Sequence, residues 1–184
     1  VIGEGATSKV YLAVDTQSNE SLAIKILKDD YKSDEKAKSV LIEEAQTLMK
    51  LNHPTIPKVE DIIDDSDCVA VVMEYVEGAT LRKIIENYGA QSAEVVIDLS
   101  LQLCDFLEYL HSFNPPYIYR DMKPANIILK PDMKIAVVDF GIMRTYKPGK
   151  AVDTVCLGTS GFAPPEQYGT AQTDPRSDIY SLGM

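Results

Sequence analysis

The sequence has no tryptophan, and only 3 cysteines and 2 histidines occur among its 184 residues. Cys68, Cys104 and Cys156 are too few and too scattered for a disulfide framework or a zinc site, and they fit a reducing compartment. No apolar run approaches the roughly 20 residues that a membrane-spanning helix requires, and no cleavable signal is visible. We therefore expect a cytoplasmic location and no membrane span in this chain.

Positive charge is also scarce. The 18 Lys and Arg residues stand against 28 Asp and Glu residues, so the formal net charge is -10. Because nucleic-acid binding favours a basic surface, we expect no nucleic-acid partner. The hydrophobic fraction of 45% is ordinary for a globular protein and argues against disorder, and the length suits one domain or two small lobes.

The pattern of elements changes from strands to helices along the chain. Residue alternation and short apolar runs predict strands at 9–15, 22–27, 59–64 and 68–75. Helices are predicted at 80–88, at 92–113 and in a segment that Ser33 or Asp34 could cap and that runs to about residue 51. This order indicates an α+β fold with a strand-rich lobe at 1–76, a helix-rich lobe at 77–184 and a link at 74–78. A ligand cleft between two such lobes is expected. The chain starts at Val1 and stops at Met184 inside an apparently helical stretch, so we expect a fragment truncated at both ends.

A glycine-rich turn opens the sequence. Gly3 and Gly5 lie between two predicted strands, where backbone N–H groups can approach phosphate oxygens, and Val10 could pack on a base. A simple hairpin turn explains the same residues equally well.

Lys25 and Glu44 are a candidate charge pair. Lys25 lies inside a predicted strand, and Glu44 lies beside the apolar stripe of the predicted helix at 34–51. A lysine and a carboxylate facing a core should pair, because an unpaired buried charge is costly. On these two residues alone, separate solvated side chains are the favoured interpretation.

The segment at 119–141 carries the sharpest pattern. Asp121, Lys123 and Asn126 precede a predicted hairpin, and Asp139 follows it. If the hairpin centres on residues 132 and 133, antiparallel pairing places Asn126 opposite Asp139. Their two oxygen-bearing side chains would then suit Mg²⁺, which often takes only one or two protein ligands. Capping of turns is the structural alternative, and convergence of these groups favours function.

These motifs follow one another in an order that resembles a eukaryotic-type (Hanks-type) serine/threonine protein kinase. The matching residues are Gly3, Gly5 and Val10; Ala23-Ile24-Lys25; Glu44; Arg120, Asp121, Lys123 and Asn126; Asp139-Phe140-Gly141; Pro164-Pro165-Glu166; and Ser177-Asp178. They span nearly the whole chain, and Gly158-Thr159 with Glu166-Gln167 resemble bacterial members in particular. The resemblance implies a bilobal protein-kinase-like fold, here incomplete, with ATP and Mg²⁺ (Mn²⁺ as the alternative ion) as cofactors.

The resemblance also implies a role for each matching residue. Lys25, held by Glu44, would contact nucleotide phosphates, Asn126 and Asp139 would bind the metal, Asp121 would act as catalytic base, and Lys123 would steady the γ-phosphate. The nucleotide would further be held by Gly3, Gly5, Val10, Ala23, Met73, Glu74, Val76 and Ile128, with Val138 as a further apolar wall. Lys123 and Thr159 would specify Ser/Thr hydroxyls of protein substrates, and the Thr159 hydroxyl would bond near Asp121 and Lys123.

Four further expectations follow from the same resemblance. Tyr119 replaces the usual histidine and should still pack on Phe140, extending an apolar stack with Leu48. Asp178 should begin a buried helix that anchors the catalytic loop, and Glu166 should lack its usual arginine partner. Phosphorylation of Thr154, or secondly Thr145, by a self-associated copy would order the segment from Asp139 to Glu166 through Arg120, with Asp153 as a partial substitute. A longer parent would allow a membrane anchor, with the kinase domain on the cytoplasmic side.

Two rival functions remain open. The first is a pseudokinase, a nucleotide-binding scaffold without turnover, and the truncation makes it most relevant to this chain. The second is a small-molecule kinase of related fold. The intact set of catalytic residues argues against the first, and the segment ending at Glu166 argues against the second.

Overall fold

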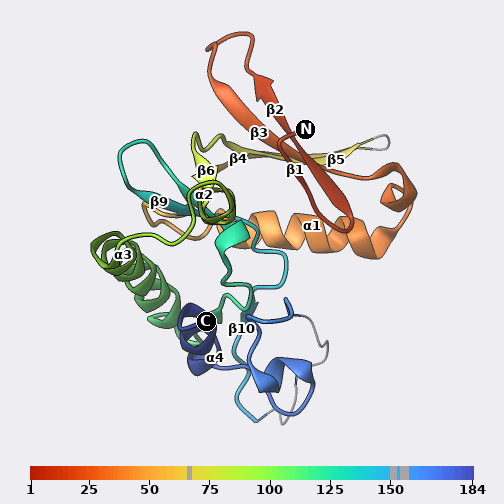
Figure 1. Ribbon diagram of the computed structural model, residues 1–184. Coiled ribbons are helices and arrows are strands. Elements are labelled where there is room, and N and C mark those ends of the chain that lie inside the picture. Colours follow the sequence, from red (N-terminus) through yellow and green to blue (C-terminus); the bar gives the residue numbers. More distant parts are fainter. Residues whose placement is uncertain (66–67, 150–152, 154–157) are drawn as a thin grey trace. The chain divides into compact units, whose positions relative to one another are not determined.

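The computed structural model describes residues 1–65, 68–149, 153 and 158–184. Thr154 and Cys156 lie outside the described residues. The described chain divides into two compact units, Val1–Glu77 and Gly78–Met184, most of whose elements are labelled in Figure 1. Each unit is described by itself below.

The first unit is built on a five-stranded antiparallel sheet. Its strands are β1 (Gly3–Glu4), β2 (Ser8–Val14), β3 (Ser21–Leu27), β4 (Val59–Asp64) and β5 (Val69–Glu74), in the spatial order β1-β2-β3-β5-β4. Lys25 of β3 lies between Val10 of β2 and Val71 of β5, and Ala23 lies opposite Met73. Register partners share a sheet face, and side chains two residues apart point the same way, so these residues line one face.

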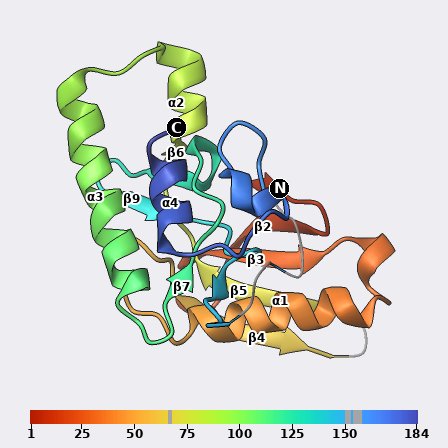
Figure 2. The same ribbon diagram turned by 90° about the horizontal axis from the view of Figure 1, so that it is seen from below.

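Helix α1 (Glu35–Leu48) covers that face, preceded by a short 3-10 helix (Asp29–Tyr31). Its N-cap is Asp34, whose side chain accepts from the N–H groups of Lys36 and Ala37, a polar start of the expected kind. Figure 2 shows α1 running beside β4 and β5.

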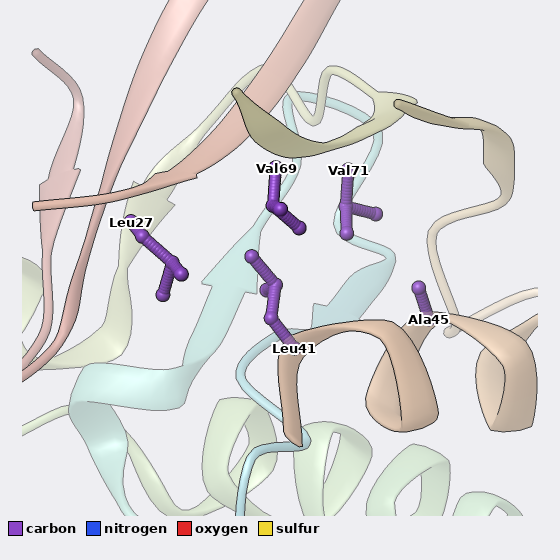
Figure 3. Close-up of a cluster of buried hydrophobic side chains, with 5 residues drawn as sticks. All are labelled: Leu27, Leu41, Ala45, Val69 and Val71. Carbon is purple, nitrogen blue, oxygen red and sulfur yellow. The ribbon is translucent and has the colours of Figure 1, made fainter. Parts of the chain in front are cut away.

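The core of the first unit forms where the helix meets the sheet. Leu41 and Ala45 of α1 point toward Leu27, Val69 and Val71 of the sheet, and all five are buried (Figure 3). The apolar spacing within α1 therefore fixes which of its sides faces β3 and β5.

The second unit is mainly helical. Its helices are α2 (Leu81–Tyr88), α3 (Ala93–His111) and α4 (Pro175–Leu182), and 3-10 turns lie at Pro124–Asn126 and Pro165–Tyr168. Thr80 caps α2 and Ser92 caps α3, each through its hydroxyl, as these residue types favour. The short strands are β6 (Ala79–Thr80), β7 (Tyr117–Ile118), β8 (Ile127–Leu129), β9 (Ile135–Val137) and β10 (Arg144–Thr145); they form a β6-β8-β9 sheet and a β7-β10 pair.

Three aromatic rings pack edge to face at the centre of the second unit. Tyr119 lies 5.3 Å from Phe140 and 5.5 Å from Phe106 of α3, measured between ring centroids. Tyr119 and Phe106 are fully buried. The predicted packing of Tyr119 on Phe140 is confirmed, and this favourable ring geometry explains how a tyrosine is accommodated there. Leu48 belongs to the other unit, so its part in the stack stays a prediction.

The hairpin of β8 and β9 differs from the expectation by one residue. Its register pairs Ile127 with Val137 and Leu129 with Ile135, so Asn126 lies opposite Val138 and not opposite Asp139. The prediction assumed a two-residue turn. The loop instead has three residues, because Met133 takes a left-handed conformation (φ 64°) and residue 130 closes the loop by bonding residue 134.

Gly78 is required where the second unit begins. Its φ is +149°, and a Cβ atom there would lie 2.3 Å from the carbonyl oxygen of Leu129. No side chain fits at that distance, so the backbone of residue 78 rests directly against β8.

Among the described helices, none is both long and apolar enough to cross a membrane.

Candidate active site

Lys25 and Glu44 form a direct ion pair within the first unit. The Lys25 Nζ atom lies 2.8 and 2.9 Å from the two carboxylate oxygens of Glu44. The side chains are only 14% and 10% exposed, so the pair is shielded from water and salt. The interpretation as two separate solvated side chains is therefore wrong. β3 and α1 supply one residue each, and packing of α1 on the sheet brings them together.

The residues expected around a base share the sheet face of Lys25. Val10, Ala23 and Met73 lie on that face by strand register, Ala23 is buried, and Met73 packs against the core of the first unit. The N–H of Glu74 donates to the carbonyl of Lys58 at 2.8 Å, so it is already committed. Only the Glu74 carbonyl could then serve a base. Val76 follows at the end of this unit, and it is half-buried.

The glycine-rich segment is a tight antiparallel turn. Gly3 pairs with Val10, and the N–H of Gly5 donates to the carbonyl of Ser8 at 2.9 Å. A Cβ atom on either glycine would meet only ordinary contacts, Val10 at 3.6 Å and Ser8 at 3.7 Å. The local fold alone therefore does not demand glycine at these two positions. Both interpretations of the segment, as a turn and as a phosphate-binding loop, remain compatible with this geometry.

Asp121 is the centre of the second group of predicted residues. Its Oδ2 accepts from Lys123 Nζ at 2.7 Å and from Asn126 Nδ2 at 2.7 Å, and its Oδ1 accepts from Thr159 at 2.8 Å. Lys123 Nζ also donates to the Thr159 hydroxyl at 2.9 Å. The expected contact of Thr159 with Asp121 and Lys123 is confirmed. The four side chains form one closed, mostly buried network in which charge-assisted bonds fix the carboxylate.

Asn126 and Asp139 lie at the same end of the hairpin. The N–H of Val138 donates to the carbonyl of Asn126 at 2.8 Å, and Asp139 is the next residue. Asp139 is exposed and has a left-handed φ of 65°, a strained conformation that redirects the chain just after β9. The Asn126 amide nitrogen is committed to Asp121, so its oxygen is the atom that could serve as a ligand.

This donor set suits a hard divalent cation. Among the described residues, no three His, Cys, Asp or Glu side chains form a metal-binding group. An amide oxygen and a carboxylate are few ligands, but they fit Mg²⁺ that is bound mainly through water and substrate phosphates. The site is thus unlike a closed structural zinc site, which needs four protein ligands.

Buried Asp178 fixes the backbone beside Asp121. Its carboxylate accepts from the N–H groups of Tyr119 at 2.9 Å and Arg120 at 2.7 Å, and it also bonds His111 Nε2 at 2.8 Å. The predicted anchoring of this loop by Asp178 of α4 is confirmed, and Asp178 is 0% exposed. The predicted start of the helix at Asp178 is wrong, because α4 already begins at Pro175, after its cap Asp174. Arg120 has a left-handed φ of 72°, so these bonds hold a conformation that a non-glycine residue rarely adopts.

The Tyr119 hydroxyl lies next to the same group of carboxylates. Burial, and then the negative charges of Asp139 and Asp121, raise the pKa of Tyr119 well above its usual value. The hydroxyl therefore stays protonated and donates to the carbonyl of Val138 at 2.7 Å. This bond ties the segment before Asp121 to the end of β9.

Comparison with known proteins agrees with this geometry. The model of the protein kinase domain family matches residues 1–184. The chain belongs to the protein kinase family. It is 36% identical to a probable serine/threonine-protein kinase of Clostridium perfringens over 184 residues, which covers 100% of this chain and 27% of that relative.

Two further bacterial relatives support the same assignment. A probable serine/threonine-protein kinase of Streptomyces coelicolor is 35% identical over 190 residues, and the serine/threonine-protein kinase PknB of Mycobacterium leprae is 35% identical over 189 residues. The whole chain is covered in both, against 28% and 30% of the relatives. The kinase chain therefore spans less than a third of the curated relatives that it matches.

Several contacts in and around the site were not predicted. Gln167 is 1% exposed, and its Nε2 donates to the carbonyl of Arg120 at 2.8 Å. Ser177 donates to Glu166 at 2.6 Å, so the Glu166 carboxylate has a hydroxyl partner. His111 reaches Asp178 across 67 residues of sequence. A buried glutamine could have been suspected from its place in the family motif, whereas the other two contacts give no signal in the sequence.

Proposed function

We propose that the protein carrying this chain transfers the γ-phosphoryl group of ATP to serine and threonine hydroxyls of protein substrates. The observation that carries the proposal is the network around Asp121, whose carboxylate is held by Lys123, Asn126 and Thr159. A carboxylate fixed in this way is prepared to orient one hydroxyl, which is how positioning lowers a barrier. Membership of the kinase family and the names of the relatives support it.

Asp121 and Lys123 would perform complementary parts of the step. Asp121 would accept the proton of the substrate hydroxyl while the hydroxyl oxygen forms a bond to the γ-phosphorus. The bond between the γ-phosphorus and the β-γ bridging oxygen breaks in the same step, which releases ADP. Lys123 would place its positive charge near the transferring group, where negative charge is spread over the phosphoryl oxygens. The Thr159 hydroxyl, shared by both residues, would keep their separation constant.

Asn126 and Asp139 would hold Mg²⁺, with Mn²⁺ as the alternative ion. When bound, such an ion neutralises phosphate charge and orients the transferring group. The Asn126 amide donates to Asp121, so the metal ligand and the base are mechanically linked. Loss of Asp139 should therefore reduce the rate of phosphoryl transfer far more than loss of a contact at the edge of the nucleotide site.

The first unit would contribute the nucleotide contacts. Lys25, oriented by Glu44, would contact the α- and β-phosphates, and the backbone at Gly3 and Gly5 would approach phosphate oxygens. Met73 would guard the back of the base, and the backbone of Glu74 and Val76 would offer hydrogen bonds. Apolar contacts with the base would come from Val10 and Ala23, and from Ile128 in the second unit.

Transfer is tested with radiolabelled ATP and casein, using the wild type, Asp121→Asn and Glu108→Gln. Glu108 is exposed on α3 and serves as the matched charge-removal control. We expect label in the protein substrate for wild type and control, and about a 10²- to 10⁴-fold lower rate for Asp121→Asn. Binding of ATP without any transfer by the wild type would favour a nucleotide-binding scaffold and reject the proposal.

Three further expectations concern partners and location. Self-association for autophosphorylation at Thr145 or Thr154, the absence of nucleic-acid binding, and a cytoplasmic kinase domain on an anchored parent all stay predictions. Thr145 lies in β10 and is half-buried. Analytical ultracentrifugation and mass spectrometry of the active protein would test the first.

A further inference from the structure

Asp153 is a buried carboxylate that the mechanism above does not use. Its side chain is 1% exposed, and it contacts two guanidinium groups, Arg120 Nη2 at 3.3 Å and Arg144 Nη1 at 2.5 Å. Thr173 completes its surroundings by donating its hydroxyl at 2.8 Å and its N–H at 3.3 Å. Each carboxylate oxygen thus has one arginine and one Thr173 donor, which is the full pairing that a buried charge requires.

Arg120 connects this carboxylate to the catalytic loop. Its backbone N–H donates to Asp178, its carbonyl accepts from Gln167, and Asp121 is the next residue. The left-handed conformation of Arg120 persists only while its surroundings hold it. Asp153 binds the side chain of Arg120, so it influences the position of Asp121 through Arg120.

The positive charges of Arg120 and Arg144 require a nearby anion. Two guanidinium groups that are 5% and 18% exposed both contact the carboxylate of Asp153. Without that carboxylate, two cations would lie close together in a largely dry environment, and their repulsion would displace Arg120.

Thr145 does not supply that anion from its own position. It follows Arg144 in β10, and neighbouring residues of a strand point to opposite faces. A phosphate on Thr145 would therefore start from the face of the strand opposite to the Arg144 side chain.

We propose that Asp153 is a positioning residue whose carboxylate supplies the anion for Arg120 and Arg144, so that transfer needs no phosphate between residues 141 and 159. This rests on the proposed function and deepens its regulation. A phosphate would have to displace a carboxylate that already occupies both guanidinium groups and Thr173.

The first test compares wild type before and after phosphatase treatment. Intact and peptide mass spectrometry would verify that no phosphate remains between residues 141 and 159. In an assay stopped within the first few per cent of ATP and casein conversion, we expect the two rates to agree within about twofold, since no required interaction has been removed. A loss of about tenfold or more on dephosphorylation, with ATP affinity kept, would overturn the proposal.

The second test changes the residue itself. Asp153→Asn keeps the shape but removes the charge, and we expect kcat to fall about tenfold or more while KM for ATP changes less than about twofold. Asp153→Glu should restore part of the rate, as should phosphoserine incorporated at position 153. Glu108→Gln is the control for loss of one exposed carboxylate. Wild-type activity in Asp153→Asn would also overturn the proposal.

A readout independent of turnover separates this proposal from the proposed function. Hydrogen exchange of the peptide covering residues 117–123 should be equal in phosphorylated and dephosphorylated wild type, and faster in Asp153→Asn than in Glu108→Gln. If no variant transfers phosphate, the proposed function fails, and the exchange result alone decides whether Asp153 positions this loop. Equal exchange in Asp153→Asn and Glu108→Gln would reject the positioning role. If Asp153→Asn does not fold, Asp153→Glu and the phosphatase comparison still decide the question.

Discussion

The two units hold their central charged residues in different ways. Within the first unit, Lys25 forms an ion pair with Glu44, which helix α1 supplies. Asp121 is held by three side chains, and Asp178 fixes the backbone of the two residues before it. A shift of α1 away from β3 would separate Glu44 from Lys25, whereas Asp121 would keep two side-chain donors if any one of its three were lost. The difference indicates that the lysine is the adjustable element and the aspartate the fixed one.

The largest effect should follow from removing Asp178, on which the fixed element depends. Asp178→Ala leaves the buried N–H groups of Tyr119 and Arg120 without their acceptor, and it also removes the partner of His111. We expect a loss of about 3–5 kcal/mol in the free energy of unfolding, a large part of the stability of a small domain. Urea denaturation followed by circular dichroism measures it. A change below about 1 kcal/mol would show that the loop does not depend on this carboxylate.

Glu44→Gln disrupts the ion pair of the adjustable Lys25, because it replaces the Glu44 carboxylate by a neutral amide. We expect about a 10²-fold loss of kcat/KM, because Lys25 loses its orientation, and a lower free energy of unfolding, because a largely buried ammonium loses its counter-charge. A double-mutant cycle with Lys25→Met sharpens the comparison, since the two losses should be far from additive if the residues act as a pair. Additive losses would mean that each residue acts alone.

A smaller effect should follow from Thr159→Val, which removes one of the three donors to Asp121. We expect about a tenfold lower kcat with little change in KM, because two donors still hold the carboxylate. Thr159→Ser keeps the hydroxyl and should retain most of the rate. Equal losses in Thr159→Val and Thr159→Ser would show that the hydroxyl bond alone does not explain the role of Thr159.

The smallest effect should follow from Tyr119→Phe, which removes the hydroxyl that donates to the Val138 carbonyl. We expect a loss of about 1 kcal/mol of stability near neutral pH. The raised pKa of Tyr119 means that the native hydroxyl keeps its proton above pH ~10, where the unfolded chain releases it, so the wild type loses stability as the pH rises. The stability difference between wild type and Tyr119→Phe should therefore narrow above pH ~10. A difference that stays constant up to pH ~11 would contradict this explanation.

Local chemistry made much of the fold predictable. Asp34, Thr80 and Ser92 cap their helices as polar residues before an apolar pattern should, and β4 has the expected bounds. The predicted register of the β8–β9 hairpin was wrong by one residue, because Met133 adopts a left-handed conformation that its residue type does not predict.

The candidate site was predictable to a similar degree. The contacts of Asp121 with Lys123 and Asn126 join residues within one short segment, where a motif is informative. The assembly of Arg120, Arg144, Asp153 and Thr173 joins segments up to 53 residues apart, and only the three-dimensional packing brings these side chains together. The pair of Lys25 and Glu44 needed either the packing of α1 or the family pattern to be recognised.

Gly78 has a practical consequence for anyone who mutates or divides this kinase. Because the backbone there touches β8 directly, even an alanine would have to push away the strand that follows Asn126. A saturation library should thus find position 78 far less permissive than exposed Glu77 beside it. A tag or a break in the chain is better placed before this residue than after it.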